Sequence, residues 1–135
     1  MTNELLGFVG EIYEASYNPG HWDAVATGLC QLLNARSGAI FLEDHEGRTR
    51  GMIGAHGLPK PVRAAYRFGI SRYDYTFQLQ RRAPLGKARQ LIRAEDVRTE
   101  HPFYYRLVLK PNDIGFLAAM NVYNDDEWHV GIGLH

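Results

Sequence analysis

The C-terminal segment places the strongest constraint on the fold of this chain. Apolar residues alternate with their neighbours over residues 116–123 and again over residues 128–134. Between these runs, Asn124-Asp125-Asp126-Glu127 consists of residues that favour turns. A period of two residues is the pattern of a strand that lies with one face on a core. The sequence therefore predicts a terminal antiparallel hairpin.

A second hairpin is predicted closer to the N-terminus. Residues 39–42 are apolar, residues 44–47 combine a glycine with acidic residues that favour a turn, and residues 50–55 complete the pair. One further strand is predicted over residues 87–91.

Helical periodicity accounts for much of the remaining sequence. Apolar residues recur every three to four positions over residues 5–13 and 22–33, with Asn3 as the expected cap of the first helix. Pro59 and Pro61 predict the start of a third helix that ends at Gly69, and a short helix is expected near residues 74–82. Pro102 suits a first helical position and predicts a helix through residue 107.

These elements predict an α+β fold. Strands at both flanks with helices between them indicate a five-stranded antiparallel sheet with helices on its faces, PAS/GAF-like in arrangement. At 135 residues with 45% hydrophobic content, the chain has the size of one domain, and no repeat or low-complexity tract divides it. We therefore expect a single sensor-like domain over residues 1–135.

Three observations concern the cellular compartment. No apolar run approaches the roughly 20 residues that cross a bilayer. The acidic start, Thr2-Asn3-Glu4, lacks the basic flank of a signal peptide. The single cysteine, Cys30, lies in an apolar helical pattern, so we expect it in the core and not in a disulfide or a metal cluster. The sequence predicts a cytoplasmic protein without membrane contact.

Charge is unevenly distributed although the net charge is zero. The segment 60–93 is strongly basic and contains one acid, Asp74, whereas the rest of the chain is rich in acids. Its basic residues are Lys60, Arg63, Arg67, Arg72, Arg81, Arg82, Lys87, Arg89 and Arg93. Such a segment attracts an anionic ligand, an acidic partner or nucleic acid, or it forms a solvated face beside acidic neighbours. We adopt the solvated face, because a neutral chain supplies little of the attraction that phosphate binding needs.

The sequence lacks the familiar signatures of catalysis. It contains no P-loop, no Gly-rich dinucleotide fingerprint after a predicted strand, no nucleophile elbow and no His-Glu-x-x-His motif. No two of its six histidines stand at the spacing of helical metal ligands. We therefore predict no enzyme activity, no cofactor and no metal, with a haem ligand at His101 as a lesser alternative.

One constellation suggests a ligand site. Aromatic residues crowd around a single acid in the middle of the chain: Tyr66, Phe68, Tyr73, Tyr75 and Phe77 around Asp74. Aromatic rings enclose small organic ligands, and one carboxylate can fix a donor group of the ligand. We add Met120 of the terminal hairpin to this candidate site. The alternative is that the rings belong to the core and that Asp74 caps a short helix.

The order of elements resembles the N-terminal sensor domain of LuxR-type helix-turn-helix transcriptional regulators. The similarity covers nearly the whole chain: two leading helices, a hairpin, Tyr66 eight positions before Asp74, a strand over residues 87–91, a helix with Phe103-Tyr104, and a hairpin over residues 114–135. The resemblance implies an autoinducer-binding-like domain that forms a homodimer. It also implies that DNA is bound only through a C-terminal helix-turn-helix domain, which is absent from these residues.

The resemblance also bears on the ligand. In the branch of this family that binds acyl-homoserine lactones, a Tyr and an Asp hold the amide of the signal and two Trp residues surround its head group. Tyr66 and Asp74 match the first two. The tryptophans have no counterpart, since Val62 stands four positions before Tyr66 and no Trp occurs between Trp22 and Trp128. A small apolar or amphipathic ligand is therefore implied without its identity.

Three functions stay open from the sequence. The one that we favour is a ligand-sensing domain of a transcriptional regulator. The second is a small enzyme in which Asp74 or a histidine acts as general base beside Tyr73 and Tyr75. The third is a ligand-free dimerisation module that uses an apolar helical stripe, formed by Leu5, Leu6, Val9 and Ile12.

Overall fold

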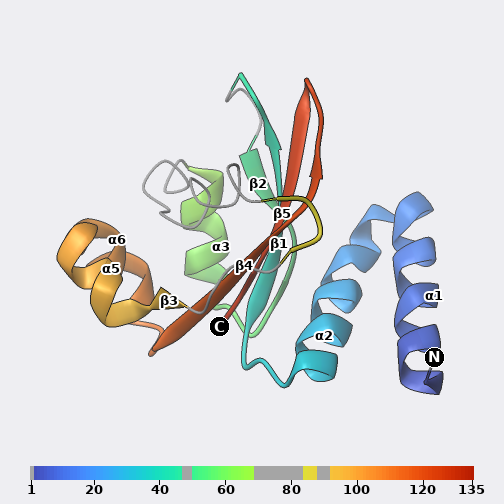
Figure 1. The fold of residues 1–135 in the computed structure, drawn as a ribbon, viewed down its shortest axis with the longest axis horizontal. Coiled ribbons are helices and arrows are strands. Elements are labelled where there is room, and N and C mark those ends of the chain that lie inside the picture. The colour runs from blue at the N-terminus through green and yellow to red at the C-terminus, as the bar shows by residue number, and fades with distance from the viewer. Residues whose placement is uncertain (1, 47–49, 69–83, 88–91) are drawn as a thin grey trace.

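The computed structural model describes residues 2–46, 50–68, 84–87 and 92–135. Within these residues the chain forms one five-stranded sheet in the order β2-β1-β5-β4-β3, and neighbouring strands are antiparallel (Figure 1). The strands are β1 (Gly38–Asp44), β2 (Arg50–His56), β3 (Ile92–Arg93), β4 (Phe116–Asn124) and β5 (Trp128–Leu134). The predicted α+β fold with a five-stranded antiparallel sheet is confirmed, as are both predicted hairpins.

Helices lie on both sides of this sheet (Figure 1). Helices α1 (Asn3–Tyr17) and α2 (Trp22–Leu33) cover one face. The other face carries α3 (Lys60–Arg67), α5 (Ala94–Glu100) and α6 (Pro102–Tyr104), which continues into the π-helical turn η3 (Tyr105–Leu109). No helix in the described residues is long and apolar enough to cross a membrane.

The central strand β1 divides the core into two halves. Successive residues of a strand point to opposite faces. Ile40 packs with Val25 and Ala26 under α1 and α2, whereas Phe41 packs with Tyr66 and other residues under α3, α5 and α6. The predicted burial of Cys30 on α2 is confirmed, and burial raises the pKa of its thiol.

Most helix boundaries follow the sequence, with one difference at the start. Thr2 caps α1 in place of the expected Asn3, because its hydroxyl accepts the backbone N–H of Leu5 at 3.2 Å. Helix α2 ends as expected at Asn34, which adopts the left-handed conformation that asparagine tolerates.

The segment between α3 and β4 departs further from expectation. The strand expected over residues 87–91 has a described counterpart only at Ile92–Arg93, which pairs with Leu117 and Phe116; residues 88–91 and the helix expected near 74–82 lie outside the described residues. Helix α5 was not expected. It buries Ala94 and Val97, and its acidic first turn suits the positive end of a helix.

Two β-bulges interrupt the alternation of side chains between the two faces of the sheet. Ile53 of β2 and Val122 of β4 have no opposite residue in the neighbouring strand. A bulge inserts one extra residue, so the side chains beyond it change phase. The alternation of β4 therefore holds from Phe116 to Asn121, and beyond Val122 it is Tyr123 that lies opposite Val130.

A close backbone contact fixes α2 against β2. A Cβ atom built on Gly54 would lie 2.6 Å from the carbonyl carbon of Trp22 and 3.0 Å from its Cβ. Only glycine permits this approach, since carbon atoms do not approach to such distances without displacement of the helix. The first turn of α2 therefore lies directly on the backbone of β2.

We expect Gly54→Ala to lower the free energy of unfolding by about 1–3 kcal/mol, the usual cost of forcing extra volume into a packed site. Urea denaturation of the two proteins measures the loss. Gly51→Ala in the same strand is the matched control, because its Cβ would meet no atom within 4 Å. An equal effect of both substitutions would show that glycine in β2 matters for another reason.

Candidate functional site

Helix α3 brings an aromatic side chain onto the sheet. Val62 and Tyr66 are four residues apart, so they lie on one side of the helix, and both are buried. The ring of Tyr66 packs against Phe41 of β1, with centroids 5.4 Å apart and planes inclined by 38°. This sequence-predicted site residue is thus placed on the sheet face between α3 and α6.

A buried hydrogen bond joins the two helices over that face. The hydroxyl oxygens of Tyr66 and Tyr104 are 2.8 Å apart, and either group can be the donor. Tyr104 lies at the end of α6, and both tyrosines are nearly inaccessible to solvent. Two adjacent hydroxyls in an apolar core give this interior a polar point that a ligand could engage.

The space enclosed beside these tyrosines is small. Its volume is about 10 Å³, close to what one water molecule needs. It is lined by Phe41, Met52, Leu58, Val62, Tyr66, Tyr104, Val108, Leu117, Ala118, Gly133 and His135. Small-molecule sites usually measure about 300–1,000 Å³. Among the described residues, the aromatic end of the face is therefore closed in this state.

A neutral imidazole lies at one edge of the same space. The Nδ1 atom of His135 is 2.9 Å from the hydroxyl of Ser37. Burial lowers the pKa of His135 to about 4, and the nearby positive charge of Arg36 adds to the effect. His135 is therefore uncharged near neutral pH and offers a hydrogen bond without a charge.

A row of buried polar residues continues this face across the sheet. Glu43 is two residues from Phe41, so both point to the same face, and Glu43 pairs with His129 of β5. Asn121 of β4 joins the row through its pairing with Gly131, the partner of Phe41. The three side chains are at most 1% exposed. The face therefore has an aromatic end and a polar end.

His129 stands out within this row. Its Nδ1 atom is 3.9 Å from Oε2 of Glu43, and within the described part of the chain neither ring nitrogen has a hydrogen-bond partner. A buried polar group without a partner costs about 1–3 kcal/mol, and native proteins keep few of them. The separation of 3.9 Å between the two groups is longer than a direct hydrogen bond.

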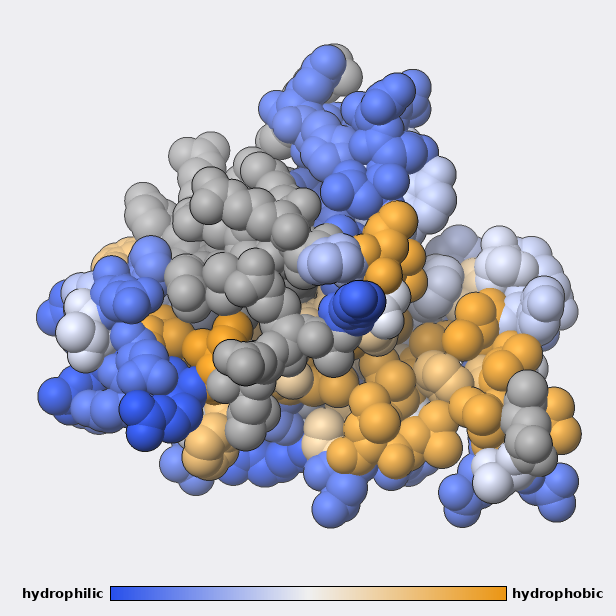
Figure 2. Space-filling model, viewed as in Figure 1, coloured by the Kyte–Doolittle hydropathy of each residue, from blue (hydrophilic) through white to orange (hydrophobic). Residues whose placement is uncertain are grey.

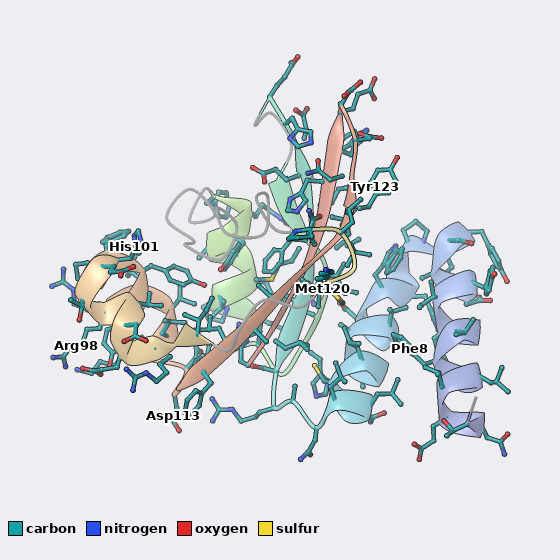
Figure 3. The ribbon with its side chains drawn as sticks, in the orientation of Figure 1. Phe8, Arg98, His101, Asp113, Met120 and Tyr123 are labelled. Atoms are coloured by element: carbon teal, nitrogen blue, oxygen red, sulfur yellow. The ribbon has the colours of Figure 1, made fainter. Side chains whose placement is uncertain are left out.

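The other sequence-predicted site residues are placed differently. Met120 pairs with Ile132, which pairs with Ile40 on the α1 and α2 side of the sheet. Tyr66 belongs to the core on the other face, with Phe41, so the register does not bring it together with Met120, which Figure 3 labels on the sheet. The remaining predicted residues, Tyr73, Asp74, Tyr75 and Phe77, lie outside the described residues.

Sequence reasoning missed Glu43 and His129. The available signal was an ionisable residue within a predicted strand, between apolar neighbours, as in Trp128-His129-Val130. Among the described residues, no group of three His, Cys, Asp or Glu side chains is arranged to hold a metal ion.

A double-mutant cycle tests the link between α3 and α6. We expect Tyr66→Phe and Tyr104→Phe each to lower stability, and the two effects to be coupled by about 1 kcal/mol, the net value of a buried hydrogen bond. Urea denaturation provides the four stabilities. Tyr13→Phe is the control partner, because Tyr13 is 69% exposed on α1 and should show no coupling to Tyr66. Zero coupling between Tyr66 and Tyr104 would contradict the hydrogen bond.

Comparison with known proteins supports the architecture. No protein-family model matches the chain, and no curated protein matches it in sequence. Among solved structures, it is similar to the LBD domain of VqsR from Pseudomonas aeruginosa, with a TM-score of 0.67 and 19% identity. The match covers 98% of this chain and 80% of that one. The chain thus shares the fold of a ligand-binding domain over nearly its whole length.

Proposed function

We propose that this chain is the ligand-sensing domain of a LuxR-type transcriptional regulator, which holds a small apolar or amphipathic molecule between the sheet and helices α3 and α6. One observation carries the proposal: His129 is fully buried, with no hydrogen-bond partner in the described residues, on the sheet face that also carries the Tyr66–Tyr104 pair. The resemblance in sequence and the fold shared with a ligand-binding domain support it.

The two ends of the face suit an amphipathic ligand. The aromatic end, with Phe41 and Tyr66, suits an apolar body, and the polar end suits a group that hydrogen-bonds to the ring of His129. Tyr73, Asp74, Tyr75 and Phe77 are the proposed remainder of the wall. Because the aromatic end is closed, binding must shift α3 or α6, and such a difference between two states is what a sensor transmits.

The wider setting is part of the same proposal. The protein acts in the cytoplasm as a homodimer, without enzyme activity and without a cofactor. It binds DNA only through a C-terminal domain absent from these residues, and these residues alone provide weak, salt-sensitive binding at most.

His129→Leu tests the ligand site. Small molecules released by denaturing the purified protein are measured by mass spectrometry, for the wild type and the variant. We expect about three- to tenfold less ligand with the variant, because one or two hydrogen bonds to the ligand are lost. The stability of the variant should be unchanged or higher, since an unsatisfied buried group has been removed.

His45→Leu is the matched control, because His45 lies exposed on the β1–β2 turn. It should retain the full amount of ligand. Loss of stability in His129→Leu, without any compound enriched in the wild type, would assign His129 a structural role and contradict the proposed site.

A ligand-free dimerisation module is the second candidate. Helix α1 leaves several apolar side chains exposed, among them Leu5, Leu6 and Ile12. Figure 2 shows apolar surface that extends from the sheet across α2 to α1. An exposed apolar strip of this kind is typical of an interface, and a second copy of the chain is its proposed occupant.

Sedimentation measures this assembly. We expect a homodimer with a dissociation constant below about 1 mM, the weak end of the affinity scale. Leu6→Glu should yield a monomer without loss of stability, because Leu6 is 53% exposed. Leu107→Glu, at a residue 46% exposed on η3, is the control and should remain dimeric. A wild-type monomer at millimolar concentration would rule out the dimer.

A further inference from the structure

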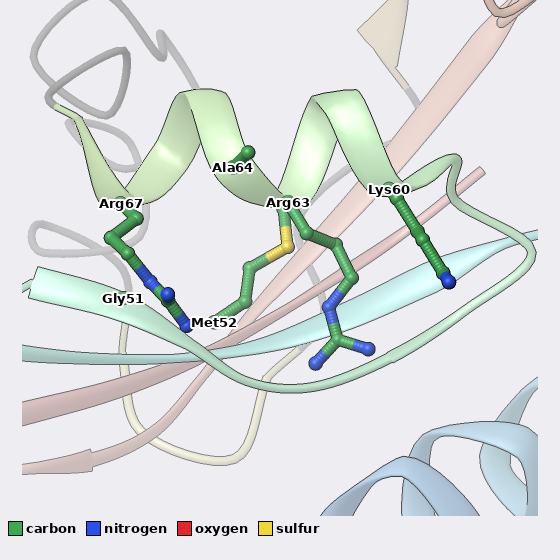
Figure 4. Close-up of a pocket in the computed structure, with 6 residues that line it drawn as sticks. All are labelled: Gly51, Met52, Lys60, Arg63, Ala64 and Arg67. Atoms are coloured by element: carbon green, nitrogen blue, oxygen red, sulfur yellow. The ribbon is translucent and has the colours of Figure 1, made fainter.

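Helix α3 presents a second, basic side to solvent. Lys60, Arg63 and Arg67 are spaced by three and four residues, so they lie along one side of the helix, away from Val62 and Tyr66. In Figure 4 the three side chains extend from α3 toward β2, and the end of Arg67 lies beside Gly51. They line a groove of about 470 Å³ together with Gly51, Met52 and Ala64.

The positive charge of this groove is only partly compensated. Arg63 forms an ion pair with Asp23 of α2, with Nη1 and Oδ2 3.1 Å apart. Within the described residues, Lys60 and Arg67 have no ion pair, and the groove has no acidic lining residue. Like charges three and four residues apart destabilise a helix. An anion bound between these cations would offset their repulsion and so stabilise the short helix α3.

The floor of the groove leaves room for a ligand. A Cβ built on Gly51 would meet no atom within 4 Å, so an occupant can approach the backbone of β2 closely. A volume of 470 Å³ falls within the usual range of small-molecule sites, about 300–1,000 Å³. By contrast, the closed space beside Tyr66, on the opposite side of α3, has a volume of about 10 Å³.

The chemistry of the three cations defines the ligand class. Guanidinium groups bind phosphate and carboxylate through paired N–H donors, and an ammonium group adds a point charge. From Lys60 to Arg67 the helix rises by roughly 10 Å, at about 1.5 Å per residue. We infer that the groove binds a small ligand carrying two or three phosphate or carboxylate groups in a row. This groove lies on the solvent side of α3, and Met52 lines both the groove and the closed space beside Tyr66.

Titration by ¹⁵N NMR with inorganic phosphate, pyrophosphate, tripolyphosphate and citrate tests the inference at an ionic strength of about 0.15 M. We expect saturable shifts at Gly51, Met52 and α3, with affinity rising along the three phosphates. Tighter binding of tripolyphosphate than of citrate assigns phosphates as the natural groups, and the reverse order assigns carboxylates. Shifts that do not saturate up to about 10 mM, beyond the weak end of the affinity scale, would overturn the inference.

Variants locate the binding. Lys60→Gln and Arg67→Gln should each weaken tripolyphosphate binding by about two- to fivefold, the scale of an exposed ion pair. Lys110→Gln and Arg106→Gln are controls with the same change in charge, at exposed cations outside the groove. Both controls should bind like the wild type. An equal loss in controls and groove variants would mean unspecific attraction to net charge, and the site would be withdrawn.

Discussion

The burial of β1 on both faces is the constraint on which the rest of this structure depends. The strand lies between β2 and β5, with α1 and α2 on one side and α3, α5 and α6 on the other. It must therefore supply apolar side chains to both halves of the core. An acidic residue in such a strand destabilises the fold, because its carboxylate loses its hydration there. Glu43 stands at this position, and His129 stands opposite it.

This arrangement separates what the sequence predicts from what it does not. Helices α1 and α2 and the two hairpins are predicted correctly, because their signals are local periodicities and turn residues. Helix α5 and strand β3 are short, and contacts with distant segments stabilise them more than their own composition does. The position of Tyr66 is predictable because its helix has one apolar side.

The polar end of the site cannot be predicted without knowing the register of the sheet. Residues 43 and 129 are far apart in the chain, and only the pairing of β1 with β5 brings them together. Met120 illustrates the reverse case. Alternation indicates that β4 has two faces, but it does not reveal which face meets α3, and Met120 lies on the other one.

Helix α2 also covers a backbone N–H group of the edge strand β2, and this matters for solubility. Asp23 accepts the backbone N–H of Ala55 on the outer strand β2, at 2.9 Å, and binds Arg63 with its other oxygen. Burial alone would raise the pKa of Asp23, but the bonds from Arg63 and Ala55 outweigh it and lower the pKa, so the carboxylate stays ionised at neutral pH. An outer strand with free N–H groups invites pairing with another chain. Here a helix side chain already occupies one of those groups, which hinders edge-to-edge aggregation.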